Sequence, residues 1–337
     1  MEYGTLGNTG LQVSKLSLGS WISFSYVLNE KEILELMSMA YSNGINLFDN
    51  AEVYGAGHSE SIMGTTLSKL KWPRENFLIC TKVFWGGSAP TAMGLTRKHI
   101  RDACHQALGR LNIDYIDIFL CHRPDSKTSI EETVWGMNVL IQQGKILYWG
   151  TSEWASHQIY EAFLLAKQYH LIPPCIEQFE YNMFHRDKGE KEYPEWLIKM
   201  GIGALTTMPL ANGILAGKYN NDTVPIDSRA NLQSHFYFKR AILSEQGMKK
   251  IEQAKKLAKI AEELDMSLPQ MVLAWSLNKV QNGSVIIGVS RLTQLEDNLK
   301  SINIQLDENV EQRIELILNN KPLLHVEPSY EEVLSES

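Results

Sequence analysis

Long apolar runs and an excess of positive charge are both missing from this sequence. No apolar run approaches the roughly 18 to 20 residues that a membrane span requires, so we expect no membrane insertion. The opening MEYGTLGNTG has no basic segment followed by an apolar one, so we expect no signal peptide. Acidic residues outnumber lysine and arginine by 39 to 32, and the net charge of -7 argues against nucleic acid or an anionic membrane as the main partner. These absences together predict a cytoplasmic protein.

Cysteine is scarce, with four residues in a chain of 337. None of them forms a CxxC pair and no HExxH motif occurs, so we predict no metal site. Scattered cysteines also fit a reducing compartment. Cys121 precedes His122, as in a Cys–His nucleophile, but neighbouring residues of a strand point to opposite faces. We therefore predict that Cys121 is buried and inert.

The glycine fingerprint of a doubly wound dinucleotide fold is missing as well. That fold carries GxGxxG after its first strand, whereas the first predicted strand here is followed by Gly-Ser-Trp-Ile at 19–22. The nearest match, GAGHSE at 55–60, lacks the third glycine and follows the second predicted strand. We therefore reject that fold.

What the sequence does contain is a repeated alternation of short apolar runs with helix-period stretches. The predicted strands cover 15–19, 45–49, 77–81, 115–121, 146–151, 175–181, 203–208 and 284–288. The predicted helices cover 30–42, 59–69, 97–111, 130–143, 156–169, 192–200, 244–264, 268–278 and 293–301. Strand–helix units repeated in this way predict an α/β fold of the (β/α)8 TIM-barrel type.

The remaining segments depart from this alternation. Residues 3–13 contain two short strands around a GNTG turn and predict an N-terminal β-hairpin that plugs the barrel floor. No linker divides residues 1–320, so we expect one domain there, followed by a mobile tail over 321–337. The irregular stretches 84–95 and 219–239 are expected to cover a site, because long loops in compact domains are usually functional.

Polar side chains follow three consecutive predicted strands. Asp49 ends the second strand, and Tyr54 lies in the loop after it. Lys82 follows the third strand and His122 the fourth. Singly, each is explained as well by a strand cap or a solvated surface group. In a parallel barrel, however, the carboxyl ends of the strands meet at one rim, where catalytic residues lie. The four residues therefore predict one catalytic centre.

Such a set suits carbonyl reduction, which needs a proton for the forming alkoxide. A tyrosine supplies one, but its ordinary pKa near 10 is high for an acid at neutral pH. An ammonium about 4 Å away offsets about 3 pKa units at an effective dielectric near 20, so we expect Lys82 to lower the pKa of Tyr54 towards 7. Asp49 keeps the lysine charged, and His122 orients the carbonyl oxygen or relays a proton.

These motifs resemble those of the aldo-keto reductases, and the resemblance covers residues 3–322. The pattern NLFDNAEVYG, then TK, then HRPD matches the catalytic tetrad of that family residue by residue. Within the family the chain resembles the β subunits of voltage-gated potassium channels. The shared stretches are GINLFD (44–49), AEVY (51–54), FWGG (84–87), YWGTS (148–152) and SLPQMVLAW (267–275). The resemblance implies NADPH lying extended across the barrel mouth and a small carbonyl compound as substrate.

The resemblance also implies a residue set for each part of NADPH. Ser152 and Gln178 hold the nicotinamide amide, with Ser20, Trp21 and Asp49 near the ring. The pyrophosphate is lined by Pro209, Leu210 and Lys218, with Arg229 in the lid over it. The adenosine end contacts Gly288, Ser290, Arg291, Gln294 and Asn298. The substrate is walled by Trp21, Phe84 and Trp85, which favours aromatic or apolar carbonyls; Trp85 is explained equally well as a loop anchor.

The segment GVSRLTQLEDN has a physical interpretation of its own. It begins a predicted helix, and the N–H groups at a helix N-terminus favour an anion. Arg291 adds a planar fork suited to phosphate. Both features favour NADPH over NADH. In the alternative, Ser290 caps the helix and Arg291 faces solvent, which would remove that preference.

Three residues depart from the potassium-channel subunits. His122 replaces an asparagine, which completes the reductase tetrad and favours turnover. Glu153 replaces arginine or asparagine, and a carboxylate beside the cofactor is unexpected unless it points away. Thr207 replaces an aromatic residue that stacks on the nicotinamide. Phe179 or Tyr181 is a candidate to compensate, unless strand alternation aims both elsewhere.

The preferred hypothesis is therefore an NADPH-dependent reductase of aldehydes or ketones, with Tyr54 as proton donor. One alternative is a redox-sensing β subunit bound to the cytoplasmic domain of an ion channel. Another is a cofactor-binding pseudoenzyme, which Glu153 and Thr207 motivate. The relatives form fourfold rings, so the resemblance implies a homotetramer.

Overall fold

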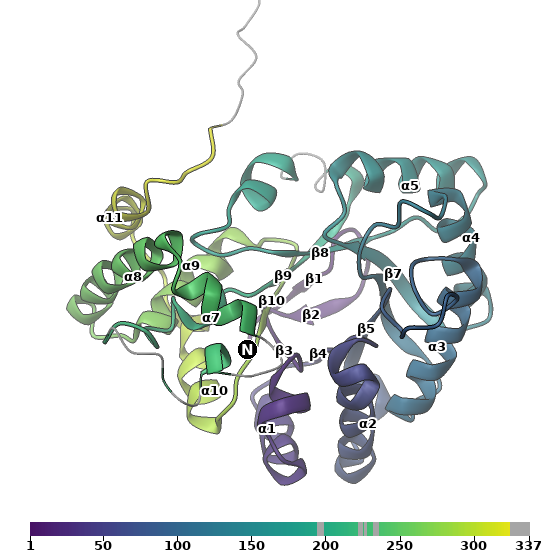
Figure 1. Cartoon of the computed structure of the whole chain (residues 1–337), viewed down its shortest axis with the longest axis horizontal. Coiled ribbons are helices and arrows are strands. Elements are labelled where there is room, and N and C mark those ends of the chain that lie inside the picture. Colours follow the sequence, from purple (N-terminus) through teal and green to yellow (C-terminus); the bar gives the residue numbers. More distant parts are fainter. Residues whose placement is uncertain (194–198, 222–224, 226–227, 232–235, 324–337) are drawn as a thin grey trace, which may run out of the picture.

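Parallel strands close into a barrel in the order expected from the sequence (Figure 1). The structure is a computed structural model that describes residues 1–323 apart from 194–198, 222–224, 226–227 and 232–235. Around the barrel lie β3 (Leu16–Gly19), β4 (Leu47–Asp49), β5 (Leu78–Val83), β6 (Ile116–Cys121), β7 (Ile146–Ser152), β8 (Ile176–Glu180), β9 (Gly203–Thr207) and β10 (Gly283–Ile287). Pairing of β10 with β3 closes the ring. Each predicted strand corresponds to one of these, and the (β/α)8 barrel is confirmed.

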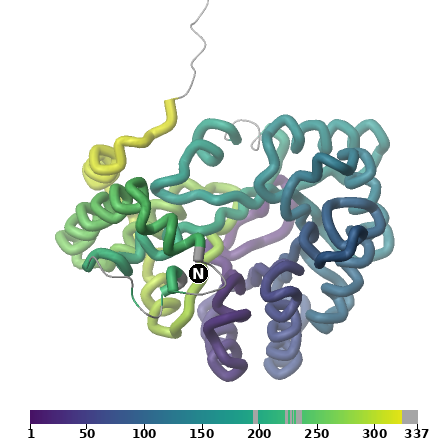
Figure 2. Tube along the Cα trace, in the orientation of Figure 1, coloured from purple at the N-terminus to yellow at the C-terminus, as the bar shows by residue number. Residues whose placement is uncertain are grey.

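Helices surround the strands, and in Figure 2 the sequence colours follow one another around the ring, so each βα unit lies beside the next. They are α1 (Glu30–Ser42), α2 (His58–Leu70), α3 (Arg97–Leu111), α4 (Ile130–Gln142), α5 (Ser156–Gln168), α8 (Glu245–Glu263), α9 (Leu268–Lys279) and α10 (Leu292–Leu299). Several begin at side-chain caps. Asn29 accepts bonds from the N–H groups of Lys31 and Glu32, and Ser267 accepts one from Gln270.

A few elements were not predicted, or fall outside the described residues. A helical turn, η1 (Ser23–Val27), follows β3 directly, and α7 (Phe236–Ile242) interrupts the predicted irregular stretch 219–239. The last helix, α11 (Glu308–Leu318), was also missed, although Val310, Ile314 and Leu318 are buried at helical spacing. Residues 194–198 of the predicted helix 192–200, and 324–337 of the predicted tail, lie outside the described residues.

Alternation along the strands divides the core into two parts. The larger part lies between the strands and the helices and includes outward-facing residues such as Phe48, Ile79 and Phe119. The smaller part fills the barrel and contains Leu47, Leu78, Cys80, Ile118, Leu120, Ile176, Leu205 and Ile286. Because inward-facing side chains recur at every second position, the residue two positions beyond the last core residue of a strand also faces the barrel interior.

The predicted hairpin is present as β1 (Tyr3–Thr5) paired antiparallel with β2 (Gln12–Ser14). Leu6 and Val13 from this hairpin are fully buried and belong to the cluster that fills the barrel. Apolar side chains therefore plug the amino ends of the strands, as expected. The opposite end of the barrel, where the carboxyl ends of the strands meet, is therefore the place for polar residues that face inward. We call this end the mouth.

Candidate active site

The residue at the mouth end of each of three neighbouring strands faces inward and is polar. Asp49 on β4, Lys82 on β5 and His122 after β6 each lie two positions beyond a member of the cluster that fills the barrel. Because side chains alternate along a strand, all three face the same interior. Tyr54 begins the turn η2 (Tyr54–Gly57) that follows β4. The structure therefore brings the four predicted residues together.

The Lys82 ammonium is fully buried and has three hydrogen-bond acceptors. Its Nζ donates to Asp49 Oδ2 at 2.8 Å, to the Asn50 carbonyl at 2.6 Å and to the Tyr54 hydroxyl at 3.2 Å. An ammonium carries three protons, so these bonds use all of its donors. The lysine, the carboxylate and the phenol are held in one fixed arrangement.

Burial changes the acidities of this group more than the sequence indicates. Burial lowers the pKa of Lys82, but Asp49, with Tyr54 and Cys80, outweighs that effect and raises the pKa above its ordinary value. Burial also raises the pKa of Tyr54, and the opposing effect of Lys82 is smaller. The prediction that Lys82 lowers the pKa of Tyr54 towards 7 is therefore wrong for this structure. Tyr54 is instead a protonated phenol at neutral pH, held in position by Lys82.

His122 faces Tyr54 across the mouth. The two ring centroids are 6.0 Å apart with the planes at 80°. Burial, together with the positive charges of Lys82 and Arg123, holds the pKa of His122 well below its ordinary value, so the ring is neutral at pH 7. Its Nδ1 is buried without a hydrogen-bond partner among the described residues.

Residues that the resemblance assigns to the nicotinamide also fix Asp49. Gln178, which faces inward on β8, donates from Nε2 to Asp49 Oδ1 at 2.9 Å. Ser20 donates from its hydroxyl and its backbone N–H to the Asp49 carbonyl, at 2.9 and 3.0 Å. Ser152 is buried at the end of β7, 3.4 Å from an Arg123 guanidinium nitrogen that donates to its hydroxyl. These three residues therefore lie around the tetrad at the mouth.

A cavity of about 410 Å³ opens beside Asp49 and Tyr54. Of the residues predicted for the cofactor, it is lined by Trp21, Asp49, Pro209, Leu210, Lys218, Gly288, Arg291, Gln294 and Asn298. Its lining also includes Gly19, Met208, Asn212, Gly213, Ala216, Pro225, Pro269, Ile286, Ile287, Val289 and Asp297, which were not predicted. All of these except Pro269 lie within four residues of a predicted one. Extending the predicted segments along the chain would have found most of them.

The N-terminus of α10 lies at this cavity. Arg291 occupies the N-cap position, is exposed and lines the cavity. Ser290 does not cap the helix, because its N–H and its hydroxyl both donate to Gln294 Oε1, at 2.9 and 3.2 Å. The alternative in which Ser290 is the N-cap is therefore wrong. Its second part, an exposed Arg291, agrees with the structure. Arg229 begins the turn η6 (Arg229–Asn231), and its side chain lies outside the described part of the structure.

Aromatic rings border Tyr54 and His122. The Trp85 centroid is 4.9 Å from that of His122, and Phe84 packs against Trp85 at 4.9 Å. Trp21 stacks near Tyr54, with centroids 6.1 Å apart. Of the three residues predicted for the substrate, Trp21 and Trp85 therefore pack against Tyr54 and His122, and Phe84 lies behind Trp85.

Of the residues that depart from the channel subunits, Glu153 lies away from the cavity and Thr207 lines it. Glu153 does not line the cavity; its carboxylate pairs with Lys188 and accepts the Glu180 N–H at 2.7 Å. The unexpected charge is thus neutralised by a lysine. Thr207 faces the same interior as Leu205 and lines the cavity.

No ring from β8 replaces the aromatic residue missing at Thr207. Because Gln178 faces inward, Phe179 faces outward, where it packs 5.0 Å from Tyr193. Tyr181 stacks on Trp275 at 5.5 Å in the outer core. The candidate compensation by Phe179 or Tyr181 is therefore wrong, and strand alternation is the reason.

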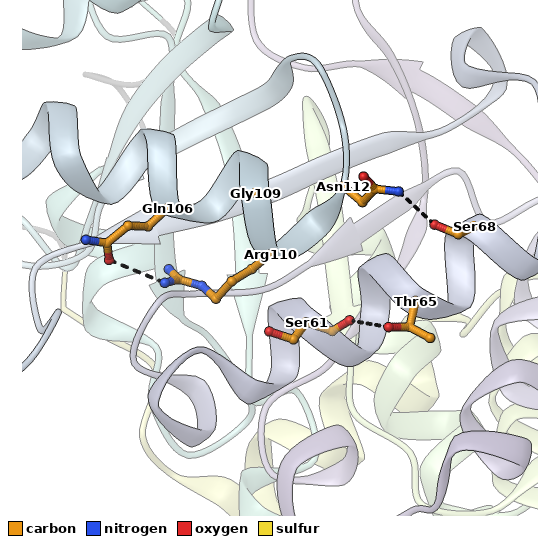
Figure 3. A pocket seen from close by; sticks show the side chains of 7 residues that line it. All are labelled: Ser61, Thr65, Ser68, Gln106, Gly109, Arg110 and Asn112. Atoms are coloured by element: carbon orange, nitrogen blue, oxygen red, sulfur yellow. Dashed lines mark hydrogen bonds between the residues drawn. The ribbon is translucent and has the colours of Figure 1, made fainter.

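A second hollow, of about 620 Å³, lies between α2 and α3 (Figure 3). It is lined by Ser61, Thr65, Ser68, Gln106, Gly109, Arg110 and Asn112. These side chains are engaged locally: Asn112 donates to Ser68 Oγ at 3.0 Å, and Arg110 donates to the buried Glu60 carboxylate at 2.7 Å. The hollow brings together no nucleophile with a base, so we assign it no chemistry.

Metal sites and membrane spans are absent from the described residues. Within them, no group of three or more His, Cys, Asp or Glu could hold a metal ion, and no helix is long and apolar enough to cross a membrane. Cys121 is buried in the outer core, and burial raises the pKa of its thiol. It faces away from the barrel interior that His122 faces, so the two are not a nucleophile pair.

Residues 15–319 match the sequence model of the Aldo/keto reductase family. The chain belongs to the aldo/keto reductase family. Membership supports an oxidoreductase of the carbonyl-reducing kind, with a small carbonyl compound as substrate and NAD(P)H as the usual cofactor of the family. The cavity fits such a cofactor, because one side reaches Asp49 and Tyr54 while another carries Arg291 and the N-terminus of α10.

The buried, neutral His122 predicts a loss of stability in acid. Its pKa is lowered in the folded protein, so below about pH 6.5 the unfolded chain binds a proton that the folded protein does not. The free energy of unfolding therefore falls as the pH drops below about 6.5, by at most about 1.4 kcal/mol per pH unit.

His122→Asn removes this contribution, so the difference in Tm between pH 7 and pH 5 should be smaller in the variant than in the wild type. The exposed His105 on α3 provides the control substitution, His105→Asn. An unchanged difference in His122→Asn would contradict the neutral imidazole.

Proposed function

We propose that this protein is an NADPH-dependent reductase of aldehydes and ketones, with Tyr54 as the proton donor. The observation that carries the proposal is the 3.2 Å hydrogen bond from Lys82 Nζ to the Tyr54 hydroxyl, at the wall of a 410 Å³ cavity. This bond fixes a protonated phenol beside a space that is large enough for parts of a cofactor and a substrate.

Tyr54 gives its proton to the carbonyl oxygen as that oxygen gains charge. Lys82 donates to the phenol oxygen, so the proton of the phenol itself remains for another acceptor. An alkoxide is a stronger base than a phenolate, so the transfer is favourable even though burial raises the pKa of Tyr54. The ammonium then stabilises the phenolate that remains, in a site shielded from water.

His122 orients the carbonyl. Because its ring is neutral, it donates through one nitrogen only, and it does not compete with Tyr54 as a strong acid. A neutral donor aimed at the oxygen stabilises the charge that develops there. Asp49 acts on Lys82 rather than on the substrate, since its two carboxylate oxygens accept from Lys82 and Gln178.

Bound NADPH would supply the hydride that adds to the carbonyl carbon. Ser152 and Gln178 would bind its nicotinamide amide, and Ser20 and Trp21 would lie near the ring. Pro209, Leu210 and Lys218 would line the pyrophosphate, with Arg229 over it. The adenosine end would meet Gly288, Ser290, Arg291, Gln294 and Asn298. Arg291 and the N-terminus of α10 suit a 2′-phosphate, which favours NADPH over NADH.

The substrate side of the mouth is apolar. Trp21 stacks near the Tyr54 ring, Trp85 packs against the His122 ring and Phe84 packs against Trp85, so aromatic or apolar carbonyl compounds are the proposed class. A flat aromatic aldehyde would stack on such rings in offset or edge-to-face geometry.

Two other functions stay as predictions from the resemblance to potassium-channel subunits. A redox-sensing subunit would bind a channel's cytoplasmic domain, and a pseudoenzyme would bind NADPH without turnover. A fourfold ring is the assembly implied by the same resemblance. Light scattering gives the mass of the assembly, and a mass near the 38.3 kDa of one chain would remove the ring.

Tyr54→Phe tests the proton donor. With saturating NADPH and a panel of aromatic aldehydes, we expect kcat to fall by about 10²- to 10⁴-fold, because the variant has no proton to give. The Kd for NADPH, measured by fluorescence titration, should stay unchanged. Tyr160→Phe on α5 is the matched control. Turnover in Tyr54→Phe equal to that of the wild type would contradict the assignment, and NADPH binding without turnover by the wild type would favour a sensor.

Arg291→Gln tests the choice of cofactor. Losing a charge-assisted contact with phosphate should raise the Kd for NADPH about tenfold or more, and leave the Kd for NADH nearly unchanged. Arg313→Gln on α11, which pairs with Glu263 and does not line the cavity, is the control. Equal weakening of both cofactors by Arg291→Gln would mean that the arginine does not recognise the 2′-phosphate.

A further inference from the structure

The loop that carries Phe84 and Trp85 has a regular base. The Gly94 N–H donates to the Phe84 carbonyl at 2.8 Å, and the Gly86 N–H donates to the Ala92 carbonyl at 2.9 Å. Trp85 and Met93 pair between them as an antiparallel bridge. Residues 84–94, which we call the substrate loop, therefore form a small closed unit with two edges. Whatever holds those two edges sets the position of the whole loop.

A buried glutamate and a buried histidine hold both edges. Glu52 lies between Asp49 and Tyr54 in the turn after β4, and His99 lies in the first turn of α3; they are 4% and 3% exposed. Glu52 Oε1 accepts the Phe84 N–H at 2.6 Å, and His99 Nδ1 donates to the Gly94 carbonyl at 2.8 Å. His99 Nε2 lies 3.4 Å from Glu52 Oε2. We call these two residues the clamp.

The two clamp residues are coupled by charge. Burial lowers the pKa of His99, but the nearby Glu52 carboxyl group, with the Gly94 carbonyl, outweighs that effect and leaves the pKa raised. The two side chains are within reach of each other's charge, and Glu52 Oε2 has no other hydrogen-bond partner among the described residues. A buried carboxylate and a buried imidazole thus depend on each other and on the substrate loop.

The substrate loop fits the clamp only because residue 86 is glycine. A Cβ at Gly86 would lie 2.6 Å from His99 Nε2 and 3.0 Å from Glu52 Oε2. The first distance is shorter than a Cβ atom tolerates and the second is a tight contact. Each partner also bonds one edge of the loop, which restricts its movement. The clamp therefore lies against the substrate loop at three residues, Phe84, Gly86 and Gly94.

The substrate loop in turn touches the reacting groups. Trp85 packs 4.9 Å from the His122 ring, and its other neighbours are Phe84 at 4.9 Å and the Arg123 guanidinium at 5.4 Å. A shift of the loop would move Trp85 relative to His122 and change the space above Tyr54. Neither Glu52 nor His99 lines the cavity, and Phe84, Trp85 and His122 do not line it either. The clamp would therefore act on the substrate at His122, through the position of Trp85.

We propose that Glu52 and His99 are positioning residues that clamp both edges of the substrate loop and so determine which carbonyl substrates fit beside His122. The proposal rests on the reductase function proposed above, since it deepens the substrate recognition of the same site. In this proposal Glu52, within the AEVY stretch, has a positioning role that is separate from the role of Tyr54 two residues later.

Three substitutions test the clamp from different sides. Glu52→Ala removes the acceptor of the Phe84 N–H. His99→Phe removes the donor to the Gly94 carbonyl while keeping an aromatic ring. Gly86→Ala leaves both clamp residues in place but adds a methyl group that should displace the loop from them. Glu52→Gln is the conservative variant, because its amide oxygen still accepts the Phe84 N–H and its NH₂ can donate to His99. Glu60→Gln is the matched control: Glu60 is fully buried and links Thr81 to Arg110 on α3 but does not contact the loop.

Steady-state kinetics with 2-naphthaldehyde and propanal give the first readout. We expect the three disruptive variants to raise KM for the bulky aldehyde about tenfold or more, with a much smaller change for propanal. The Kd for NADPH should stay unchanged, and Glu52→Gln should recover most of the loss. A loss shared equally by both aldehydes, or the same loss in Glu60→Gln, would mean a general structural role and would overturn the proposal.

Hydrogen exchange gives a second readout that needs no substrate. The amides of Phe84, Gly86 and Gly94 should exchange about tenfold faster or more in Glu52→Ala and His99→Phe, while Glu60→Gln leaves them protected. If the wild type reduces no aldehyde but these amides lose protection, the reductase function fails and the clamp stands. If the amides keep their protection in all variants, the clamp fails whatever the protein catalyses.

Discussion

The buried Lys82 ammonium is the interaction on which the mouth of the barrel depends. A charge removed from water costs several kcal/mol unless it is paired and fully hydrogen-bonded. Asp49 supplies the opposite charge, and the Asn50 carbonyl and the Tyr54 hydroxyl accept hydrogen bonds from the other two N–H groups. Asp49 is then held by Gln178 from β8 and by Ser20 after β3. One polar chain therefore ties β3, β4, β5 and β8 together at their carboxyl ends, where the apolar barrel core stops.

The same burial sets the protonation states that the chemistry requires. Burial raises the pKa of Tyr54 and lowers that of His122, so both are neutral, while Lys82 stays charged beside Asp49. The proposed proton donor Tyr54 and the proposed hydrogen-bond donor His122 thus lie next to a fixed positive charge. One short turn organises this arrangement. In residues 49–54, Asp49 pairs with Lys82, Glu52 accepts the Phe84 N–H and Tyr54 lines the cavity. Six consecutive residues would therefore supply the anchoring of Lys82, the proposed positioning of the substrate loop and the proposed proton transfer.

Much of the barrel follows from sequence because its rules are local. The apolar runs and their alternation with helical stretches identify the strands of the ring, and a period of two then places Asp49, Lys82 and His122 on one interior. The same rule, applied to β8, shows that Phe179 cannot face the cavity once Gln178 is known to face inward. The sequence alone left both directions open, because it does not say which alternate set of residues faces the barrel interior. The helix α11 was missed although its buried residues have regular spacing.

What the sequence does not reveal depends on distant parts of the chain. The direction of the pKa change of Tyr54 was predicted wrongly. The lysine is visible in the sequence, whereas the extent of burial depends on how distant parts of the chain pack around the phenol. The contact of Glu52 and His99 joins residues 47 positions apart through a loop between them, and no local pattern indicates it. The lining of the cavity beside Tyr54 was predicted in part, because the motifs mark some of its residues and the folded chain supplies their neighbours.

The central claim is that Lys82 acts through Tyr54, and a double-mutant cycle tests it most directly. The rate constant for hydride transfer would be measured in single-turnover reactions for the wild type, Lys82→Met, Tyr54→Phe and the double variant, after circular dichroism has shown that each is folded. If the lysine serves the phenol, the double variant should be no slower than the slower single variant, because residues that act as one unit are not additive. If the two losses instead multiply, Lys82 and Tyr54 act independently, and the claim that the lysine works through the phenol is contradicted.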